Sequence, residues 1–125
     1  MNDKKKMKEH KVFLSGQISG RDIESAKDHF KRVEIDLTKR GKFILNPADN
    51  VPREAWQDYM RDSISQLVRC EAVVMLDDWQ DSRGATIERN LALELGLPVY
   101  YERYLDEYFD DYPCKYAYDI VKESK

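Results

Sequence analysis

The sequence predicts a small α/β domain of the Rossmann-like or flavodoxin-like kind, built in three layers, with a parallel sheet of four to five strands and helices on both faces. Short apolar runs alternate with longer amphipathic stretches along the 125 residues. The central run, residues 72–76, is apolar throughout and rich in β-branched side chains, as in a strand buried on both faces. The links between these segments are short, which favours parallel strands joined by helical crossovers.

The composition excludes several classes of protein. The net charge of -3 argues against a nucleic acid polymer as a partner. No apolar stretch is long enough to span a membrane, and the lysine-rich start lacks the apolar segment of a signal peptide. We therefore expect a cytoplasmic protein without a membrane partner.

Cysteine and histidine usage predicts neither a disulfide framework nor a metal site, and we expect no cofactor. Cys70 stands at a predicted helix-to-strand junction and is expected to be a buried thiol; Cys114 has no clear role. Neither His10 nor His29 has the neighbours of a metal-binding motif. His29 is expected on a solvated helix face.

The first ligand loop is predicted directly after the first strand. Residues 1–10 are expected to form a flexible polar tail, and residues 12–14 a short core strand. The next segment, residues 15–20, has two glycines four positions apart beside two hydroxyls, which suits close approach of a backbone to a phosphate or sugar. Glycines also form ordinary turns, so the loop alone is a weak signal. Its candidate ligand contacts are Ser15, Gly16, Gln17 and Ile18.

Helices and strands then alternate. Residues 22–40 predict a helix whose apolar residues recur every three or four positions: Ile23, Ala26, Phe30, Val33 and Leu37. A strand is expected at residues 43–45, stopped by Asn46 and Pro47. A second helix is expected over residues 53–69, with Pro52 at its first turn. Its expected buried residues are Trp56, Met60, Ile64, Leu67 and Val68.

The central strand leads into the stretch around which the domain is organised. A charged loop follows Leu76, and a helix is expected over residues 85–95, closed by Gly96. Backbone N–H groups at a helix N-terminus favour anions, and open α/β sheets bind ligands at the carboxyl ends of their strands. The candidate ligand contacts here are Asp77, Trp79, Ser82, Arg83 and Gly84.

Glu88 is the main catalytic candidate. It shares a helix face with apolar residues, namely Leu91, Ala92 and Leu95. A carboxylate on such a face is costly unless it has a partner or a task. The structural alternative is a carboxylate stabilised by the helix dipole or by a neighbour along the helix. If the first strand lies between the second and third, the loops after Leu14 and Leu76 face each other across one crevice.

The last strand is expected at residues 98–101, which end the α/β domain of residues 11–101. Residues 102–125 form an acidic, tyrosine-rich segment, expected to be helical. Tyrosines at every fourth position from 100 to 116 would line one side of a helix until Pro113 interrupts it. Packing or dimerisation is the first interpretation of this stripe, ahead of base stacking.

Taken in order, six short motifs resemble one known superfamily. They are Phe13-Leu14-Ser15-Gly16-Gln17-Ile18-Ser19-Gly20, Asn46-Pro47-Ala48, Trp56-x-x-Tyr59-Met60-Arg61, Cys70-Glu71-Ala72-Val73-Val74, Trp79-x-x-Ser82-Arg83-Gly84-Ala85-x-x-Glu88 and Ala92-x-x-Leu95-Gly96-Leu97-Pro98-Val99. This order resembles the nucleoside 2-deoxyribosyltransferase-like superfamily, which includes the 2'-deoxynucleoside 5'-monophosphate N-hydrolases. It is most similar to a small phage and bacterial branch. The resemblance covers residues 11–101.

The resemblance implies cleavage of an N-glycosidic bond in a nucleoside or nucleotide. The glutamate matched by Glu88 attacks the anomeric carbon, and water or a second base resolves the covalent intermediate. Ser82 matches a serine that binds the 5'-phosphate in the hydrolase branch, and Ser15 and Gly16 match a sugar- or phosphate-contacting turn. Two cations suggested for a phosphate by chemistry alone are Arg83 and Arg21.

The sequence departs from the family pattern at one position. The superfamily usually has an aspartate immediately before the residue matched by Ile64, where this chain has Ser63, with Asp62 one place earlier. One residue is about 100° of helix, so Asp62 is expected to project away from the apolar stripe that Ser63 borders. Either the helix is irregular and Asp62 helps Glu88, or a serine stands where the helper carboxylate should be. Asp77 and Asp78 are possible substitutes.

Three functional hypotheses follow. The first is an N-glycosidase or deoxyribosyltransferase acting on a small nucleoside or nucleotide. The second is a nucleotide-binding protein without turnover, which is favoured if Glu88 is the sole carboxylate of its pocket. The third is an interaction domain using the aromatic tail, for which a pocket filled by side chains would be decisive. A homodimer formed by the tail and the helix of Trp56 is expected as the working unit.

Overall fold

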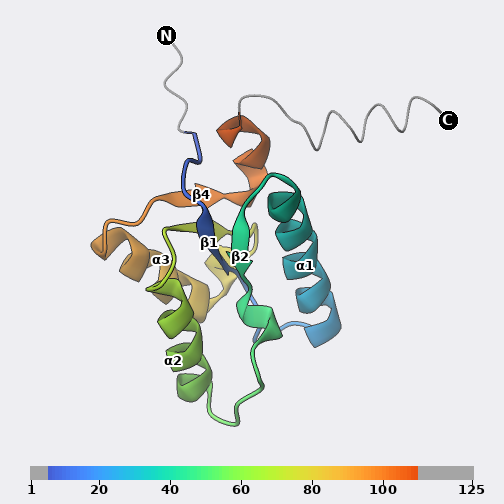
Figure 1. Ribbon diagram of the computed structural model, residues 1–125. Coiled ribbons are helices and arrows are strands. Elements are labelled where there is room, and N and C mark those ends of the chain that lie inside the picture. The colour runs from blue at the N-terminus through green and yellow to red at the C-terminus, as the bar shows by residue number, and fades with distance from the viewer. Residues whose placement is uncertain (1–5, 110–125) are drawn as a thin grey trace, which may run out of the picture.

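The computed structural model describes residues 6–109, and its centre is a parallel sheet of four strands in the order β2-β1-β3-β4 (Figure 1). The strands are β1 (Lys11–Ser15), β2 (Phe43–Leu45), β3 (Ala72–Met75) and β4 (Val99–Tyr101). Phe13 of β1 pairs with Leu45 on one side and with Val73 on the other. The first strand therefore lies between the second and third, as the crevice hypothesis required.

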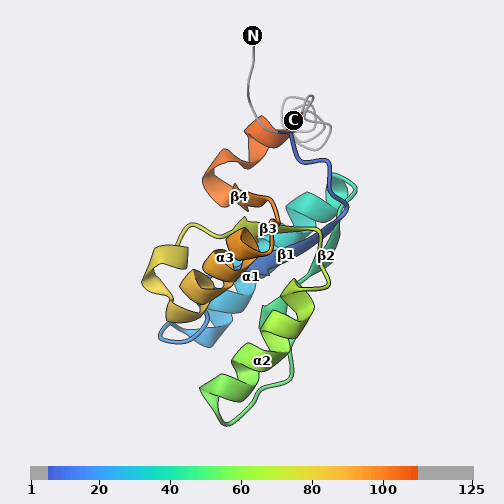
Figure 2. The same cartoon turned by 90° about the vertical axis from the view of Figure 1, so that its left-hand side faces the viewer.

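Helices cover both faces of the sheet, which confirms the predicted three-layer α/β class. The helices are α1 (Ile23–Lys39), α2 (Trp56–Leu67) and α3 (Arg83–Glu94). Alternate residues of the strands point to opposite faces, so Leu14 joins the core under α1 while Phe13 joins the core under α2 and α3. Figures 1 and 2 show α1 on one side of the sheet and the other two helices on the opposite side.

The helix α1 follows its predicted pattern closely. The side chain of Asp22 caps its N-terminus by accepting a hydrogen bond from the Ser25 N–H. Its buried residues are Ala26, Phe30, Val33 and Leu37, whereas Ile23 in the first turn is 48% exposed. Gly41 follows with a φ of 90°, a conformation that only glycine adopts easily.

The helix α2 differs from its prediction at both ends. It begins at Trp56, so Pro52 lies outside its first turn, and Arg53 instead pairs with Asp62 across the helix surface. Val68, just past its last residue, is exposed. The fully buried polar residue Ser63 takes a place on its inner face.

The chain ends also differ from expectation. Within the expected polar tail, Met7 is buried in the core and donates its backbone N–H to the carbonyl of Tyr108. Tyr100 lies buried in β4, as expected from the predicted last strand, and so is not part of a helical stripe; Tyr108 packs edge-on against its ring. The segment after β4 is a kinked 3-10 turn, Glu102–Tyr108, with Tyr104 half exposed at the kink. The predicted helical tyrosine stripe is therefore wrong for these residues.

Three further predictions have different outcomes. Cys70 is buried as expected, and burial raises its pKa to about 11, so its thiol is poorly reactive. Tyr112, Tyr116 and Cys114 lie outside the described residues. Within residues 6–109, no helix combines the length and the apolar character needed to cross a membrane.

Candidate active site

The loops that follow β1 and β3 meet at the carboxyl edge of the sheet. The Leu76 N–H donates to the Ser15 carbonyl at 2.7 Å, and the Gln17 N–H donates to Asp78 Oδ1 at 3.1 Å. A Cβ atom on Gly16 would lie 2.9 Å from the Cβ of Leu76, so only glycine allows this approach. The switch point of the sheet thus brings both predicted loops together.

Glu88 lies where three elements converge. Its side chain comes from α3, and the residue is 4% exposed. The hydroxyl of Ser15 at the end of β1 donates to Oε1 at 2.6 Å, and the hydroxyl of Ser63 on α2 donates to Oε2 at 2.6 Å. Both serines are fully buried. A carboxylate accepts about four hydrogen bonds, so each oxygen keeps a further acceptor position.

The surroundings of Glu88 disfavour its charge. Burial raises its pKa to about 7, against the two serine hydrogen bonds, which lower it. Burial also raises the pKa of the neighbouring Tyr59, and the charge of Glu88 adds to that shift. A carboxylate that titrates near neutrality can act in either protonation state at physiological pH, which is a property of catalytic groups.

An open cleft of about 530 Å³ leads to Glu88. Its walls are the first loop, the turn after β2, one side of α2 and the start of α3. The lining residues are Gly16, Gln17, Ile18, Ser19, Gly20, Pro47, Trp56, Gln57, Tyr59, Met60, Asp81, Ser82, Arg83, Gly84, Ala85 and Glu88. Since Glu88 is itself buried, it lies at the floor, and the cleft is large enough for a small-molecule ligand.

Two sides of the cleft have distinct chemistry. Trp56 and Tyr59 supply an aromatic wall, and the Arg83 guanidinium lies 4.5 Å from the ring centre of Trp56. The start of α3 supplies a polar side, where the Ser82 hydroxyl caps the helix by accepting from the Ala85 N–H at 3.0 Å. Helix N-termini of this kind attract anions.

Close packing of α2 against α3 depends on Gly84. A Cβ atom there would lie 2.9 Å from the sulfur of Met60. The glycine therefore brings the N-terminus of α3 close to the inner face of α2. The contact helps to bring Ser63 of α2 within hydrogen-bond distance of Glu88.

Several predicted site residues lie elsewhere. Asp62 is on the outer side of α2, where its carboxylate pairs with Arg53 at 2.6 Å, so the structure does not bring this predicted catalytic group into the cleft. The helix is regular there, and one residue of rotation separates Asp62 from the inward Ser63. Asp77 directs its carboxylate toward Arg103, and Trp79 packs against Tyr101; neither lines the cleft.

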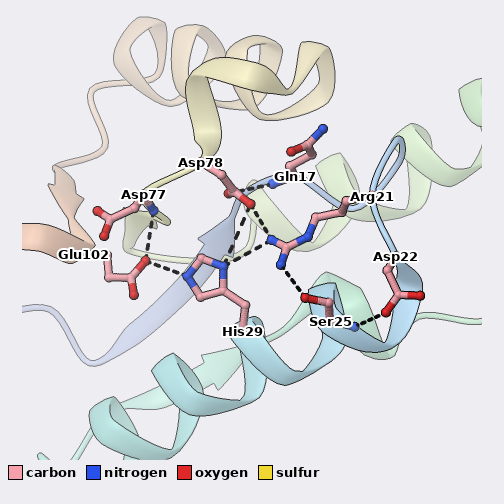
Figure 3. Close-up of polar contacts among 8 residues, drawn as sticks. All are labelled: Gln17, Arg21, Asp22, Ser25, His29, Asp77, Asp78 and Glu102. Atoms are coloured by element: carbon pink, nitrogen blue, oxygen red, sulfur yellow. Dashed lines mark hydrogen bonds and ion pairs between the residues drawn. The ribbon is translucent and has the colours of Figure 1, made fainter.

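Sequence analysis also missed two residues that line the cleft and one partly buried residue near it. Asp81 and Gln57 line it, although no motif singled them out. His29, expected to be solvated, has a side chain only 13% exposed between Arg21 and Glu102 (Figure 3). Arg21, a suggested phosphate cation, does not line the cleft. Within residues 6–109, no three His, Cys, Asp or Glu side chains gather as a metal site.

Comparison with protein families now adds to this geometry. Residues 10–101 match the domain of unknown function DUF4406. The chain belongs to this family. No curated protein matches the DUF4406 chain.

A solved structure resembles the DUF4406 chain at the level of the fold. This is a 2-deoxyribosyltransferase from the psychrotolerant bacterium Bacillus psychrosaccharolyticus, with a TM-score of 0.57 and 16% sequence identity. The likeness covers 73% of this chain and 70% of the transferase. It confirms the predicted α/β fold and the resemblance to the 2-deoxyribosyltransferase-like superfamily in fold.

Proposed function

We propose that the chain cleaves the N-glycosidic bond of a (deoxy)nucleoside or nucleoside 5'-monophosphate, with Glu88 as nucleophile. The glycosyl group then passes either to water or to a second base. The observation that carries this proposal is the buried Glu88 carboxylate at the floor of an open cleft. Each of its oxygens accepts one serine hydroxyl and keeps room for a further contact. The fold shared with a 2-deoxyribosyltransferase supports the same class of chemistry by analogy.

In the proposed first step, a Glu88 oxygen attacks the anomeric carbon of the sugar. The bond from this carbon to the base nitrogen breaks, its electron pair leaves with the base, and the base takes a proton from solvent water. A glycosyl ester with Glu88 results, and water or a second base then displaces the carboxylate. Ser15 and Ser63 would hold the carboxylate in the orientation required for attack.

The cleft also favours a particular orientation of substrate. The aromatic wall of Trp56 and Tyr59 suits the flat face of a nucleobase. The start of α3, with Ser82 and Arg83, suits a 5'-phosphate because helix N–H groups and a guanidinium both favour anions. We therefore propose a nucleoside 5'-monophosphate as the preferred substrate.

One observation favours nucleotide binding without turnover as the second candidate. The fully buried Ser63 occupies the position of the usual helper carboxylate, and a serine does not exchange protons as a carboxylate does. Among residues 6–109, the cleft-lining carboxylates are Glu88 and Asp81, and Asp81 is exposed at the rim. A filled pocket would have favoured the third hypothesis, an interaction domain, and the open cleft does not supply that support.

We also propose a homodimer as the working unit. At the C-terminal ends of α2 and α3, Val68, Leu93 and Leu95 are each about half exposed, which leaves apolar surface for a partner. Sedimentation equilibrium tests the dimer. A monomer at micromolar concentration with full activity would contradict it.

A panel assay tests the catalytic proposal. The wild-type chain is incubated with nucleosides and nucleoside 5'-monophosphates, and released base is measured by chromatography. We expect release from at least one monophosphate and none with Glu88→Gln. Tight binding without release in the wild type would favour the second candidate.

A further inference from the structure

A charged cluster lies behind the first loop and consists of Arg21, His29, Asp78 and Glu102 (Figure 3). None of these four residues lines the cleft. Its centre is Asp78, which follows β3. Asp78 Oδ1 accepts the Gln17 N–H at 3.1 Å, and a Cβ atom on Gly16 would lie 3.1 Å from the same oxygen. Asp78 Oδ2 accepts a hydrogen bond from the Arg21 guanidinium. One carboxylate thus contacts the start and the end of the loop.

Arg21 is fixed in turn by residues of α1. Its guanidinium donates to the Ser25 hydroxyl at 3.0 Å and lies 3.3 Å from His29 Nδ1. His29 Nδ1 also lies 3.9 Å from Asp78 Oδ2, and the other ring nitrogen lies 2.9 Å from Glu102 Oε1.

Glu102 completes the cluster from the segment after β4. Its Oε1 also accepts the backbone N–H of Asp77 at 2.9 Å. Burial, the largest influence, raises the pKa of Glu102, but the hydrogen bonds from His29 and Asp77 and the charges of His29 and Arg32 together outweigh it, so the pKa is lowered. The ionised Glu102 therefore fixes both His29 and the backbone next to Asp78.

We propose that Asp78 is a positioning residue for the site: with Arg21, His29 and Glu102 behind it, it holds residues 16–17 in place beside the cleft. This inference rests on the proposed function for its catalytic consequence. Gln17 lines the cleft, and the adjoining Ser15 donates to Glu88, so a shift of this backbone would disturb both the wall and the nucleophile. A charged acceptor makes the loop contact stronger than a neutral one.

The opposite end of β1 offers a matched control. The exposed Glu71 accepts the backbone N–H groups of His10 and Lys11, each at 2.9 Å. This carboxylate holds the amino end of the strand as Asp78 holds the loop at its carboxyl end. Glu71 lies outside the cleft, so Glu71→Ala removes a comparable backbone contact without reaching the site.

Amide hydrogen exchange, measured by NMR on the full chain without ligand, tests the positioning directly. In Asp78→Ala, we expect the Gln17 amide to exchange about tenfold faster or more, with β3 amides unchanged. Asp78→Asn keeps an oxygen acceptor and should give a smaller increase; it also serves if Asp78→Ala does not fold. Glu71→Ala should leave Gln17 unchanged. Unaltered Gln17 exchange in the folded Asp78 variants, or equal acceleration across the sheet, would overturn the proposal.

Base release gives the second readout. We expect Asp78→Ala to lower kcat more than it raises KM, with partial rescue in Asp78→Asn and wild-type values in Glu71→Ala. Equal kinetic losses in Asp78→Ala and Glu71→Ala would refute a specific role for Asp78. If the wild-type chain releases no base, the proposed function fails, while the exchange result still decides whether Asp78 holds the loop.

Discussion

Two acidic residues, Glu88 and Asp78, lie at the same edge of the sheet, but Glu88 has neutral partners and Asp78 has a cationic one. Glu88 accepts hydrogen bonds only from neutral serine hydroxyls among the described residues, and burial raises its pKa to about 7. Asp78 is paired with the Arg21 guanidinium and accepts a backbone N–H. One carboxylate is buried without a compensating cation, and the other has its cation in contact.

This difference separates a reactive group from a supporting one. A buried carboxylate without a cation destabilises the fold when it ionises, and groups perturbed in this way are concentrated at functional sites. A carboxylate paired with arginine is stabilised in its charged form and is suited to holding a loop.

Removing the Glu88 charge should have the largest effect. Glu88→Gln keeps the size and the hydrogen-bonding shape of the side chain but cannot form a stable glycosyl ester, so base release should fall by about a thousandfold or more. Steady-state kinetics on a responsive monophosphate measures this loss. The control is Glu94→Gln, an exposed glutamate on the same helix. Base release retained in Glu88→Gln would refute the nucleophile.

The raised pKa of Glu88 also predicts how stability changes with pH. The folded pKa of about 7 exceeds the ordinary value of 4.5, so the folded state holds this proton more tightly than the unfolded state. The resulting stabilisation is complete below about pH 4.5 and is lost as pH rises through about 7. As the pH rises from about 5 to about 8, the free energy of unfolding of Glu88→Gln should increase by up to about 3 kcal/mol relative to that of the wild type.

Urea unfolding of both proteins across this range measures the difference, with Glu94→Gln as the control. A stability difference independent of pH would show that Glu88 titrates normally. The base-release rate of the wild type should rise over the same range, because the nucleophile must be ionised. A rate that falls as pH rises through about 7 would contradict this assignment.

Ser82→Ala should have an intermediate effect that depends on the ligand. If the 5'-phosphate binds at the start of α3, the variant should bind a monophosphate about tenfold more weakly, and its affinity for the matching nucleoside should fall much less. The Ser82 side chain also caps α3, so stability should fall by about 1 kcal/mol. Titration calorimetry with a matched nucleoside and monophosphate separates the two effects. Equal losses for both ligands would exclude a phosphate at this helix end.

Much of this arrangement could be predicted because it depends on local pattern. The strands and α1 follow from apolar runs and a helical rhythm, and Glu88 stood out as a charge on an apolar face. The strand order entered only as a condition of the crevice hypothesis, which the structure meets. The 3-10 turn after β4 could not be predicted from tyrosine spacing. Tyr100 is in a strand there, and the chain kinks at Tyr104.

Long-range partners explain the remaining misses. His29 pairs with Glu102, 73 positions away in the sequence, and helix periodicity alone gives no sign of such a partner. Asp78 likewise meets Arg21 only because β1 and β3 are neighbours. Local sequence predicts which face of a helix is buried, but it does not identify the polar groups that the fold brings to that face.

The smallest predicted effects separate Ser63 from its neighbour Asp62. The Ser63 hydroxyl lowers the pKa of Glu88, so Ser63→Ala should move the midpoint of the pH–rate profile above about 7 and slow base release several-fold at neutral pH. Asp62→Ala removes only an exposed ion pair with Arg53, so stability should change by less than about 1 kcal/mol and the midpoint should not move. The pH–rate profiles of both variants provide the measurement. A shifted midpoint in Asp62→Ala, with Ser63→Ala unchanged, would mean that α2 rotates when substrate binds and that the helper carboxylate is Asp62 after all.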